Sequence, residues 1–407
     1  MNQISGIKAA GTLDPSFGVE GTVSLPNGTR SIVVLPNKKV VALTDNRPEK
    51  MNTLTRLTEM GELDPSFGDN GVVELPKETD RIFPEQIIAL KNGGYLLLGY
   101  QPGTQSRVKY VCRLLENGQL DTTFGIRGIG EIYLPSDATF VIGASMAVSE
   151  LSGEIYLCTS VYSVSNGFLG AIFRLSKDGF LDLGFGSGIV FIQLDGAPYF
   201  YIALRSLAVY GDGVLIGGEF LSESRDRGVA FLKRYNQDGR LDSSFGEGGT
   251  VVIPKDAAGA DSRTTISSVV VRDDDGLIVM TGALHKGSEV EGLLAVLNSN
   301  GGFNLVFNGG KPLYATFLPG LVFSTGVLQQ GTKIIVTGYD EAGRVMAARY
   351  EFNGSLDSTF GSKGWVIFKE MEGGEFVRSS ELTPDNKVVV LGQERNELRV
   401  FAIRYLG

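Results

Sequence analysis

The sequence contains a single histidine, and this limits the catalytic chemistry available to the chain. His285 lies in Ala283-Leu-His-Lys286, and no Gly-x-Ser-x-Gly motif accompanies it to present a nucleophilic serine. A multi-histidine metal site is excluded, and a Ser–His–Asp triad would have to use this one residue. We interpret His285 as a solvated loop residue, and we expect no metal and no cofactor.

Regularly spaced aspartates are the second group that could carry chemistry. Each Leu-Asp-x-x-Phe-Gly loop offers one carboxylate, whereas a calcium site needs several oxygen ligands at alternate positions. Asp273-Asp-Asp275 is a solitary acidic turn. Hydrolysis by a carboxylate pair would need two acids brought together, and no spacing identifies such a pair. We therefore interpret the loop aspartates as residues that cap their own turns.

An arginine precedes most of these aspartates by eight residues. In one copy both are lost together, and Val296 and Asn304 stand in their places. Breaking one half of a buried ion pair costs about 3–5 kcal/mol, whereas removing both halves can be nearly neutral. Joint loss therefore indicates paired side chains. The expected structural pairs are Arg56–Asp64, Arg113–Asp121, Arg174–Asp182, Arg234–Asp242, Arg349–Asp357 and, if the two ends of the chain meet, Arg404–Asp14.

The aspartates belong to a repeat that runs through the whole chain of 407 residues. The copies recur at the spacing of supersecondary units, as their start positions below show, so we expect one domain over residues 1–407. Copies start near residues 11, 61, 118, 179, 239, 301 and 354, and the aromatic anchors are Phe17, Phe67, Phe124, Phe185, Phe245, Phe307 and Phe360.

Each copy contains about four strand-like segments and no sustained helical period. A short alternating run such as Gly71–Leu75 precedes a hairpin with an Asn-, Asp- or Gly-rich turn. The outgoing arm, such as Tyr95–Leu98, is apolar at every position and so must be covered on both faces. These features predict an all-β, seven-bladed β-propeller of four-stranded antiparallel blades, closed by proximity of the N- and C-termini. A parallel β-helix is the alternative, but its coils are usually much shorter.

The unit Leu-Asp-x-x-Phe-Gly-x-x-Gly-x-Val, followed by a hairpin and by Ala-x-x-Arg-Tyr-x-x-x-Gly, resembles the bacterial delta-60 repeat family. The resemblance covers nearly the whole chain, and six of the seven copies keep the core of the motif. It implies a β-propeller-like bacterial protein of largely undefined role, and it transfers no catalytic residue. Members often look like secreted or surface proteins.

Composition bears on partners and location. The net charge of −9 and the pI near 5.0 argue against nucleic acid or an anionic membrane as partner. No stretch approaches the roughly 18 apolar residues of a membrane span. The start, Met1–Ala10, does not resemble a signal peptide, which predicts a cytoplasmic protein, with export by a signal-peptide-independent route left open. Cys112 and Cys158 are expected to be buried free thiols, and the protein a monomer.

The loops predict a binding face. In an up-and-down blade, the connection into the hairpin's first strand and the connection after its second strand open on the same face. Both vary widely here, as binding faces of repeat proteins do. Arginine and aromatic side chains are the usual anchors of an interface. The candidates on this variable-loop face are Arg81, Tyr199, Tyr201, Arg225, Arg227, Arg263, His285 and Arg378.

We therefore expect a non-catalytic propeller that binds a protein, a small molecule or a carbohydrate on the variable-loop face. Two alternatives remain open. One is a hydrolase or lyase that works at the mouth of the central channel. The other is a recognition module of an exported bacterial effector.

Overall fold

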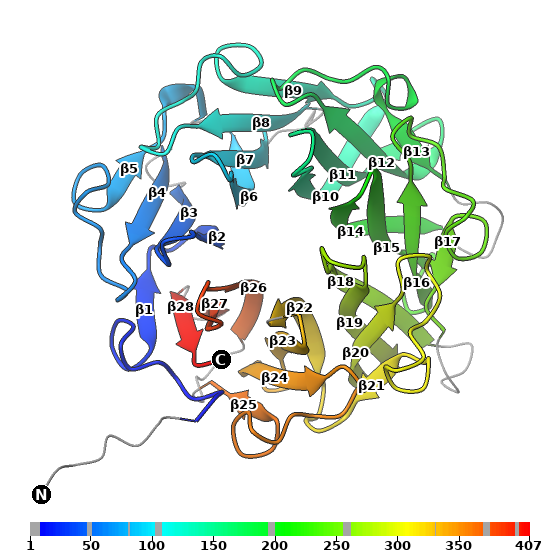
Figure 1. Cartoon of the computed structure of the whole chain (residues 1–407). Helices are drawn as coiled ribbons and strands as arrows, with labels where there is room; N and C mark the ends of the chain where they lie inside the picture. Colours follow the sequence, from blue (N-terminus) through cyan, green and yellow to red (C-terminus); the bar gives the residue numbers. More distant parts are fainter. Residues whose placement is uncertain are drawn as a thin grey trace, which may run out of the picture.

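The computed structural model describes residues 9–46, 51–79, 82–101, 108–193, 200–254, 262–329, 331–368, 375–394 and 399–407. The sheets stand around a common axis like the blades of a propeller (Figure 1). The described residues contain β strands and two single-turn 3-10 helices, η2 (Lys77–Thr79) and η3 (Gly186–Gly188), but no α-helix. The prediction of an all-β propeller is confirmed.

Five sheets contain four antiparallel strands each, with the hairpin's first strand nearest the axis (Figure 1). Their strands are β2 (Thr29–Val34), β3 (Val40–Asn46), β4 (Met51–Leu57) and β5 (Val72–Glu74); β6 (Phe83–Ala89), β7 (Tyr95–Tyr100), β8 (Val108–Leu114) and β9 (Ile129–Tyr133); β10 (Ala138–Val148), β11 (Ile155–Ser163), β12 (Gly167–Leu175) and β13 (Val190–Ile192); β22 (Val322–Gln329), β23 (Lys333–Tyr339), β24 (Val345–Glu351) and β25 (Trp365–Ile367); and β26 (Glu375–Leu382), β27 (Val388–Glu394), β28 (Val400–Tyr405) and β1 (Thr22–Leu25).

The remaining sheet has eight strands, because two four-stranded arrays touch within it. Between them, β16 and β18 run parallel and share the single residue pair Gly228–Arg263. Within each array the strands form antiparallel ladders. The arrays are β14 (Tyr201–Tyr210), β15 (Gly213–Leu221), β16 (Gly228–Tyr235) and β17 (Thr250–Val252), and β18 (Ser262–Val271), β19 (Ile278–Lys286), β20 (Glu289–Leu297) and β21 (Leu313–Ala315).

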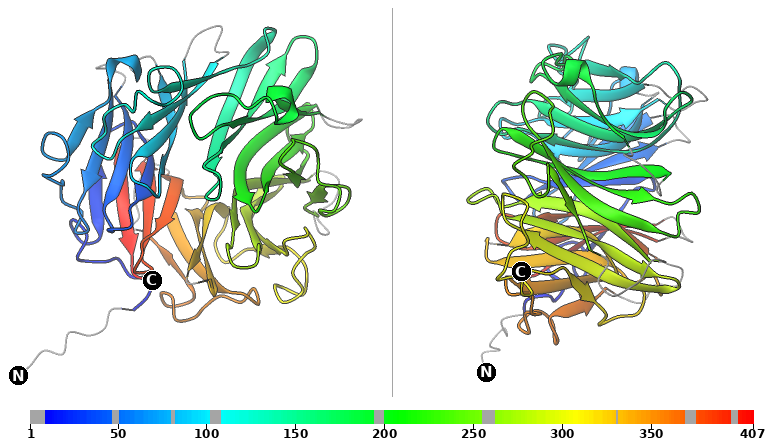
Figure 2. Two further views of the ribbon diagram at one scale, coloured as in Figure 1. Left: turned by 45° about the horizontal axis from the view of Figure 1, so that its top comes forward. Right: turned by 90° about the vertical axis from the view of Figure 1, so that its right-hand side faces the viewer.

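The two ends of the chain meet in one sheet. β1 pairs with β28 in antiparallel register from Thr22–Ile403 to Leu25–Val400, and blue β1 lies beside red β28 in both views of the ring (Figures 1 and 2). The predicted proximity of the ends is confirmed.

The sequence repeat and the sheet are out of phase by one strand. The alternating run that follows each Leu-Asp-x-x-Phe-Gly loop, such as Val72–Glu74, pairs with the strand before the loop and becomes the outer edge of the preceding sheet. The sequence pattern predicts this run as the first strand of its own hairpin's unit, and the structure corrects that prediction. The shift has a structural consequence, because the first such run, β1, has no preceding sheet and completes the last one.

The Leu-Asp-x-x-Phe-Gly loop is held by its aromatic anchor and by a backbone turn. All seven anchors are at most 1% exposed. The following glycine has a left-handed conformation, as at Gly68 with a φ of 56°, and a Cβ there would lie 2.1 Å from Val72 O. In the sixth copy Asn308 takes this place with a φ of 46°, because asparagine tolerates the left-handed region.

Both cysteines lie inside the core as free thiols, as expected. Burial raises the pKa of Cys112 and of Cys158 to about 12, so neither thiol ionises at neutral pH.

Candidate functional site

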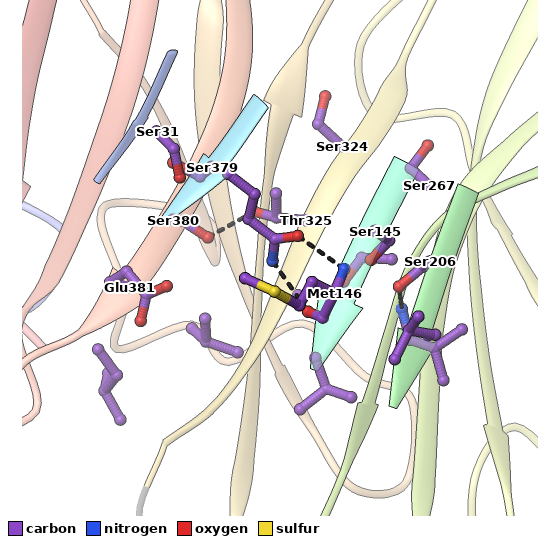
Figure 3. A pocket seen from close by; sticks show the side chains of 18 of the residues that line it. Ser31, Ser145, Met146, Ser206, Ser267, Ser324, Thr325, Ser379, Ser380 and Glu381 are labelled. Atoms are coloured by element: carbon purple, nitrogen blue, oxygen red, sulfur yellow. Dashed lines mark hydrogen bonds between the residues drawn. The ribbon is translucent and has the colours of Figure 1, made fainter. Parts of the chain in front are cut away.

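A cavity of about 760 Å³ lies on the ring axis. Its wall is formed by the innermost strands, β2, β6, β10, β14, β18, β22 and β26, so it is built from the whole length of the chain (Figure 3). The lining extends along these strands to the hairpin turns, where Asp273, Asp274 and Gly331 contribute. The cavity therefore reaches the face opposite the variable loops.

Every innermost strand has a β-bulge at the equivalent place, where the register with its neighbour shifts by one residue. A bulge leaves one residue without a partner and redirects its side chain. We call these extra residues the bulge ring: Arg30, Glu85, Gly143, Arg205, Ser267, Ser324 and Arg378.

The position after the bulge forms a mostly polar ring that connects neighbouring sheets. Ser31 Oγ accepts a hydrogen bond from Ile87 N at 3.3 Å, and Ser206 Oγ accepts one from Val269 N at 3.0 Å. Gln86 accepts from Met146 N at 2.8 Å and donates to Met146 O at 3.2 Å (Figure 3). The wall is thus held in place by contacts between sheets. The ring consists of Ser31, Gln86, Ala144, Ser206, Ser268, Thr325 and Ser379.

Hydroxyl groups remain available on this wall. Ser267 and Ser324 belong to the bulge ring, are half-buried and line the cavity (Figure 3). Ser379 Oγ, by contrast, is fully buried behind the wall and has no hydrogen-bond partner among the described residues. A wall with free hydroxyl groups is suited to hydrogen-bonding a polar ligand.

Three of the four charged bulge residues have an opposite charge beside them. Arg30 Nη2 lies 3.2 Å from Asp45 Oδ2, and Arg205 Nη2 lies 2.9 Å from Glu219 Oε1. Glu85 Oε2 accepts from Lys109 Nζ at 2.7 Å. The fourth residue is Arg378, considered separately because its partner is neutral.

Glu381 is the other unusual side chain of the wall. Two positions beyond the polar ring, the remaining sheets carry apolar residues: Val33, Ile88, Met146, Ala208, Val270 and Val327. Glu381 is half-buried there and lies on the cavity wall (Figure 3), and no ion pair or hydrogen bond to its carboxyl group is found among the described residues. Burial raises the pKa of Glu381 to about 7, so it exchanges a proton near neutral pH.

The structure brings four of the predicted loop-face residues together at one side of the variable-loop face. The Arg225 guanidinium lies 4.2 Å from the centre of the Tyr201 ring, and its carbonyl accepts a 3.0 Å hydrogen bond from Arg263 Nη1. His285 faces Arg263 across the β18–β19 ladder. This corrects our interpretation of His285 as a solvated loop residue: it is in β19, and burial together with the Arg263 charge lowers its pKa to about 4.

The other predicted residues lie elsewhere. Arg227 is exposed in the connection between β15 and β16, apart from the cavity lining. Arg378 lines the cavity. Arg81 and Tyr199 lie outside the described residues.

The sequence reasoning missed Arg30, Arg205 and Glu381. A usable signal was present for the arginines, because the dipeptide Arg-Ser recurs in the first strand of the hairpin at residues 30–31, 205–206 and 378–379. Each instance marks a bulge. Glu381 had no such signal, because its isolation depends on which side chains surround it in the ring.

The six expected arginine–aspartate pairs are all in contact. Their closest nitrogen–oxygen distances lie between 2.6 and 3.4 Å. In the sixth copy Asn304 Nδ2 instead donates to Asn298 Oδ1 at 2.7 Å, and Val296 is buried. These loops connect strands at the outer part of each sheet, so the pairs act on the fold and not on the cavity.

No group of His, Cys, Asp and Glu in the described part of the chain is arranged to hold a metal ion. Within the same residues, no helix is both long and apolar enough to cross a membrane.

Comparison with known proteins supports the propeller and leaves the activity undetermined. The family described as "Domain of unknown function (DUF5122) beta-propeller" matches residues 211–245, which run from the β14–β15 turn to Phe245. No curated protein matches the sequence. Among solved structures, the polysaccharide lyase Uly1 superposes with a TM-score of 0.57 at 13% identity, covering 100% of this chain and 94% of that one. Drosophila Semaphorin 2a gives 0.55 at 10% identity, covering 97% and 76%. At these identities the similarity concerns the fold alone.

Proposed function

We propose that this protein is a non-catalytic, ligand-binding β-propeller that holds its ligand in the central cavity and contacts it or its carrier through the variable-loop face. The observation that carries the proposal is the cavity wall. All of the innermost strands contribute to it, and their bulges direct charged and hydroxyl-bearing side chains inward. Such a concave, largely preformed site with a few polar groups is typical of small-molecule binding.

The proposal includes the finer description of the ring. We count the eight-stranded sheet as two blades, because a single residue pair joins its halves, and this gives seven blades. We also propose that the segment matched by the DUF5122 family is one copy of a repeat that covers the chain, as the resemblance to delta-60 repeats implies. We further propose a monomer in the cytoplasm, with neither nucleic acid nor a membrane as partner.

Filling the cavity tests the function. Ser267→Trp and Ser324→Trp place a large side chain at two bulge positions whose serines have no described hydrogen bonds, so the links between sheets remain. Ser358→Trp, at an exposed serine of an outer Leu-Asp-x-x-Phe-Gly loop that is not part of the cavity lining, is the matched control. Ligands are first found by thermal-shift screening of small metabolites and of neutral and acidic saccharides against the unaltered protein.

We expect the two filled variants to lose the identified ligand, while the Ser358→Trp protein keeps it. Retention of binding in both filled variants would contradict the cavity as the site. Loss of binding in Arg225→Ala and Tyr201→Ala alone would instead place the ligand on the aromatic and arginine cluster of the variable-loop face.

One observation favours a second function, a hydrolase or lyase. Glu381 has a pKa near 7 and faces the cavity, which are properties of a general acid or base. A second catalytic group is needed beside it, and Glu85, the other glutamate of the wall, is paired with Lys109. Turnover of a cavity ligand that disappears in Glu381→Gln, with binding retained, would establish this alternative.

A further inference from the structure

We infer that the cavity recognises an oxyanion, a carboxylate or sulfate carried by a polyhydroxylated molecule such as an acidic sugar, through Arg378 and Arg30. The inference rests on the proposed ligand-binding function and specifies its ligand class. It is derived from the charge balance of the bulge ring.

Arg378 and Arg30 face the cavity from adjacent strands on the two sides of the ring closure. Arg378 is the bulge residue of β26 and Arg30 is that of β2, and these strands pack against each other. Both side chains line the cavity. Desolvation lowers the pKa of Arg378, and the nearby positive charge of Arg30 lowers it further. The Arg378 guanidinium stays charged, since the ordinary pKa of arginine is above 12.

The two arginines have too few carboxylates beside them. Arg30 has Asp45, whereas the described side-chain contact of Arg378 is with the neutral amide of Gln393, whose Oε1 lies 2.7 Å from Arg378 Nε. An oxyanion would supply the missing negative charge. Guanidinium groups bind carboxylate and sulfate through paired hydrogen bonds, which are stronger than bonds between neutral groups.

The register shows that the missing carboxylate is a local change in a common arrangement. Three sheets have an arginine at the bulge. In each of them, the residue before the bulge pairs with a residue of the hairpin's second strand, and the next residue of that second strand contacts the guanidinium. That position holds Asp45 for Arg30, Glu219 for Arg205 and Gln393 for Arg378. Only in the sheet of Arg378 does an amide replace the acid, so its guanidinium keeps an unbalanced charge toward the cavity.

The rest of the wall fits the body of such a ligand. Ser324 lines the wall from β22, which packs against the strand of Arg378, and Ser267 lines it from β18. Both serines are half-buried and line the cavity, so their hydroxyl groups can hydrogen-bond a ligand. Charge recognition by the arginines and hydrogen bonds from the serines together select a molecule that is both acidic and hydroxylated.

The decisive variant is Gln393→Glu. It completes the arrangement seen at Asp45 and Glu219, removes no arginine and gives Arg378 an internal carboxylate. Arg378→Gln is the second variant; it leaves no acid unpaired, so it should fold. The probes are D-glucuronate, inorganic sulfate and, as the neutral match of the first, D-glucose, titrated by NMR against the full chain.

We expect glucuronate to bind at least about tenfold more tightly than glucose, a difference of about 1.4 kcal/mol, and sulfate to compete with it. Gln393→Glu and Arg378→Gln should each weaken glucuronate by about tenfold or more and leave glucose unchanged. If sulfate competes with glucuronate but binds more weakly than glucuronate does, the hydroxyl groups of the sugar contribute to binding, as the inference requires.

Equal binding of glucuronate and glucose, or unchanged affinity in both variants, would overturn the inference. If Ser267→Trp then still abolishes binding of both sugars, the proposed function stands without its acidic ligand. Failure of glucuronate and sulfate to bind the unaltered protein also overturns the inference, and the broader ligand screen then decides the proposed function independently.

Discussion

The ion pair between Arg404 and Asp14 lies where the two ends of the chain meet, and its removal should cost more stability than loss of the more exposed Arg113–Asp121 pair. Arg404 is 1% exposed, and its Nε and Nη2 each lie 2.8 Å from Asp14 Oδ2. Its guanidinium also lies 4.4 Å from the centre of the Phe17 ring. Arg404→Met therefore leaves the carboxylate of Asp14 buried, with Lys387 Nζ at 2.9 Å as its remaining cation.

The magnitude follows from burial. Either Arg404→Met or Asp14→Asn leaves one buried charge without its main partner, which costs about 3–5 kcal/mol of unfolding free energy. The double variant Arg404→Met, Asp14→Asn removes both charges, as Val296 and Asn304 do in the sixth repeat, so its loss should fall short of the sum of the two single losses by about 2–3 kcal/mol. Arg113→Met is the matched control. Its pair is 21% and 17% exposed, so the expected loss is roughly 1 kcal/mol.

Urea unfolding measures these differences, with the single tryptophan, Trp365, as fluorescent probe and circular dichroism as a second signal. The reasoning fails if Arg404→Met loses no more than Arg113→Met, or if the two single losses add without coupling. Additive losses would mean that β1 and β28 are held by their backbone ladder and that the buried charges act independently.

Three further predictions concern pH and backbone strain. Glu381→Gln should raise the free energy of unfolding at pH 8 by up to about 3 kcal/mol and leave it nearly unchanged at pH 4. The reason is that burial raises the pKa of Glu381 from 4.5 to about 7, so this carboxyl group destabilises the fold only where it is ionised. Thermal melts at both pH values check this, and equal effects would contradict it. The pH dependence from Asp14 has the opposite sign. Burial raises the pKa of Asp14, but hydrogen bonds from Ser16 and Lys387 and the charge of Arg404 lower this pKa overall. The ionised carboxylate therefore stabilises the fold, and the destabilisation by Asp14→Asn should shrink as the pH falls below 3.8. Gly68→Ala should cost more than Gly248→Ala, whose φ of 58° is similar but whose Cβ would meet nothing within 4 Å; equal melting temperatures would refute the steric part.

The outer part of each sheet could be predicted from the sequence because it is under the same constraint in every copy. An arginine that always precedes an aspartate by eight residues in the sequence indicates a local contact between the two. The joint change to Val296 and Asn304 in one copy supports a pairing of these positions. Arg404 and Asp14 each have no partner eight residues away, so the same reasoning predicts that they pair where the two ends of the chain meet. The pairing of β1 with β28 is the structural expression of the same periodicity.

The inner part could not be predicted in the same way. A bulge has no fixed composition, and its seven extra residues range from Gly143 to Arg378. The phase of the sheets was also hidden, because a repeat in sequence does not say whether a terminal strand joins the preceding or the following hairpin. The environment of Glu381 depends on residues from distant copies, which no local pattern reports.

This contrast separates stability from recognition in the ring. Outer strands and loops repeat the same arginine, aspartate and phenylalanine contacts, so a change there breaks a contact that the fold needs. The bulge residues face the axis and have no partner in the backbone ladder, so they can differ from sheet to sheet without loss of the ladder. Replacement of an acid by Gln393 is such a change: the Arg378 charge, neutralised in the equivalent sheets, remains directed at the cavity. Position-by-position comparison of the bulges, and not of the repeated loops, therefore bears on the ligand that we propose.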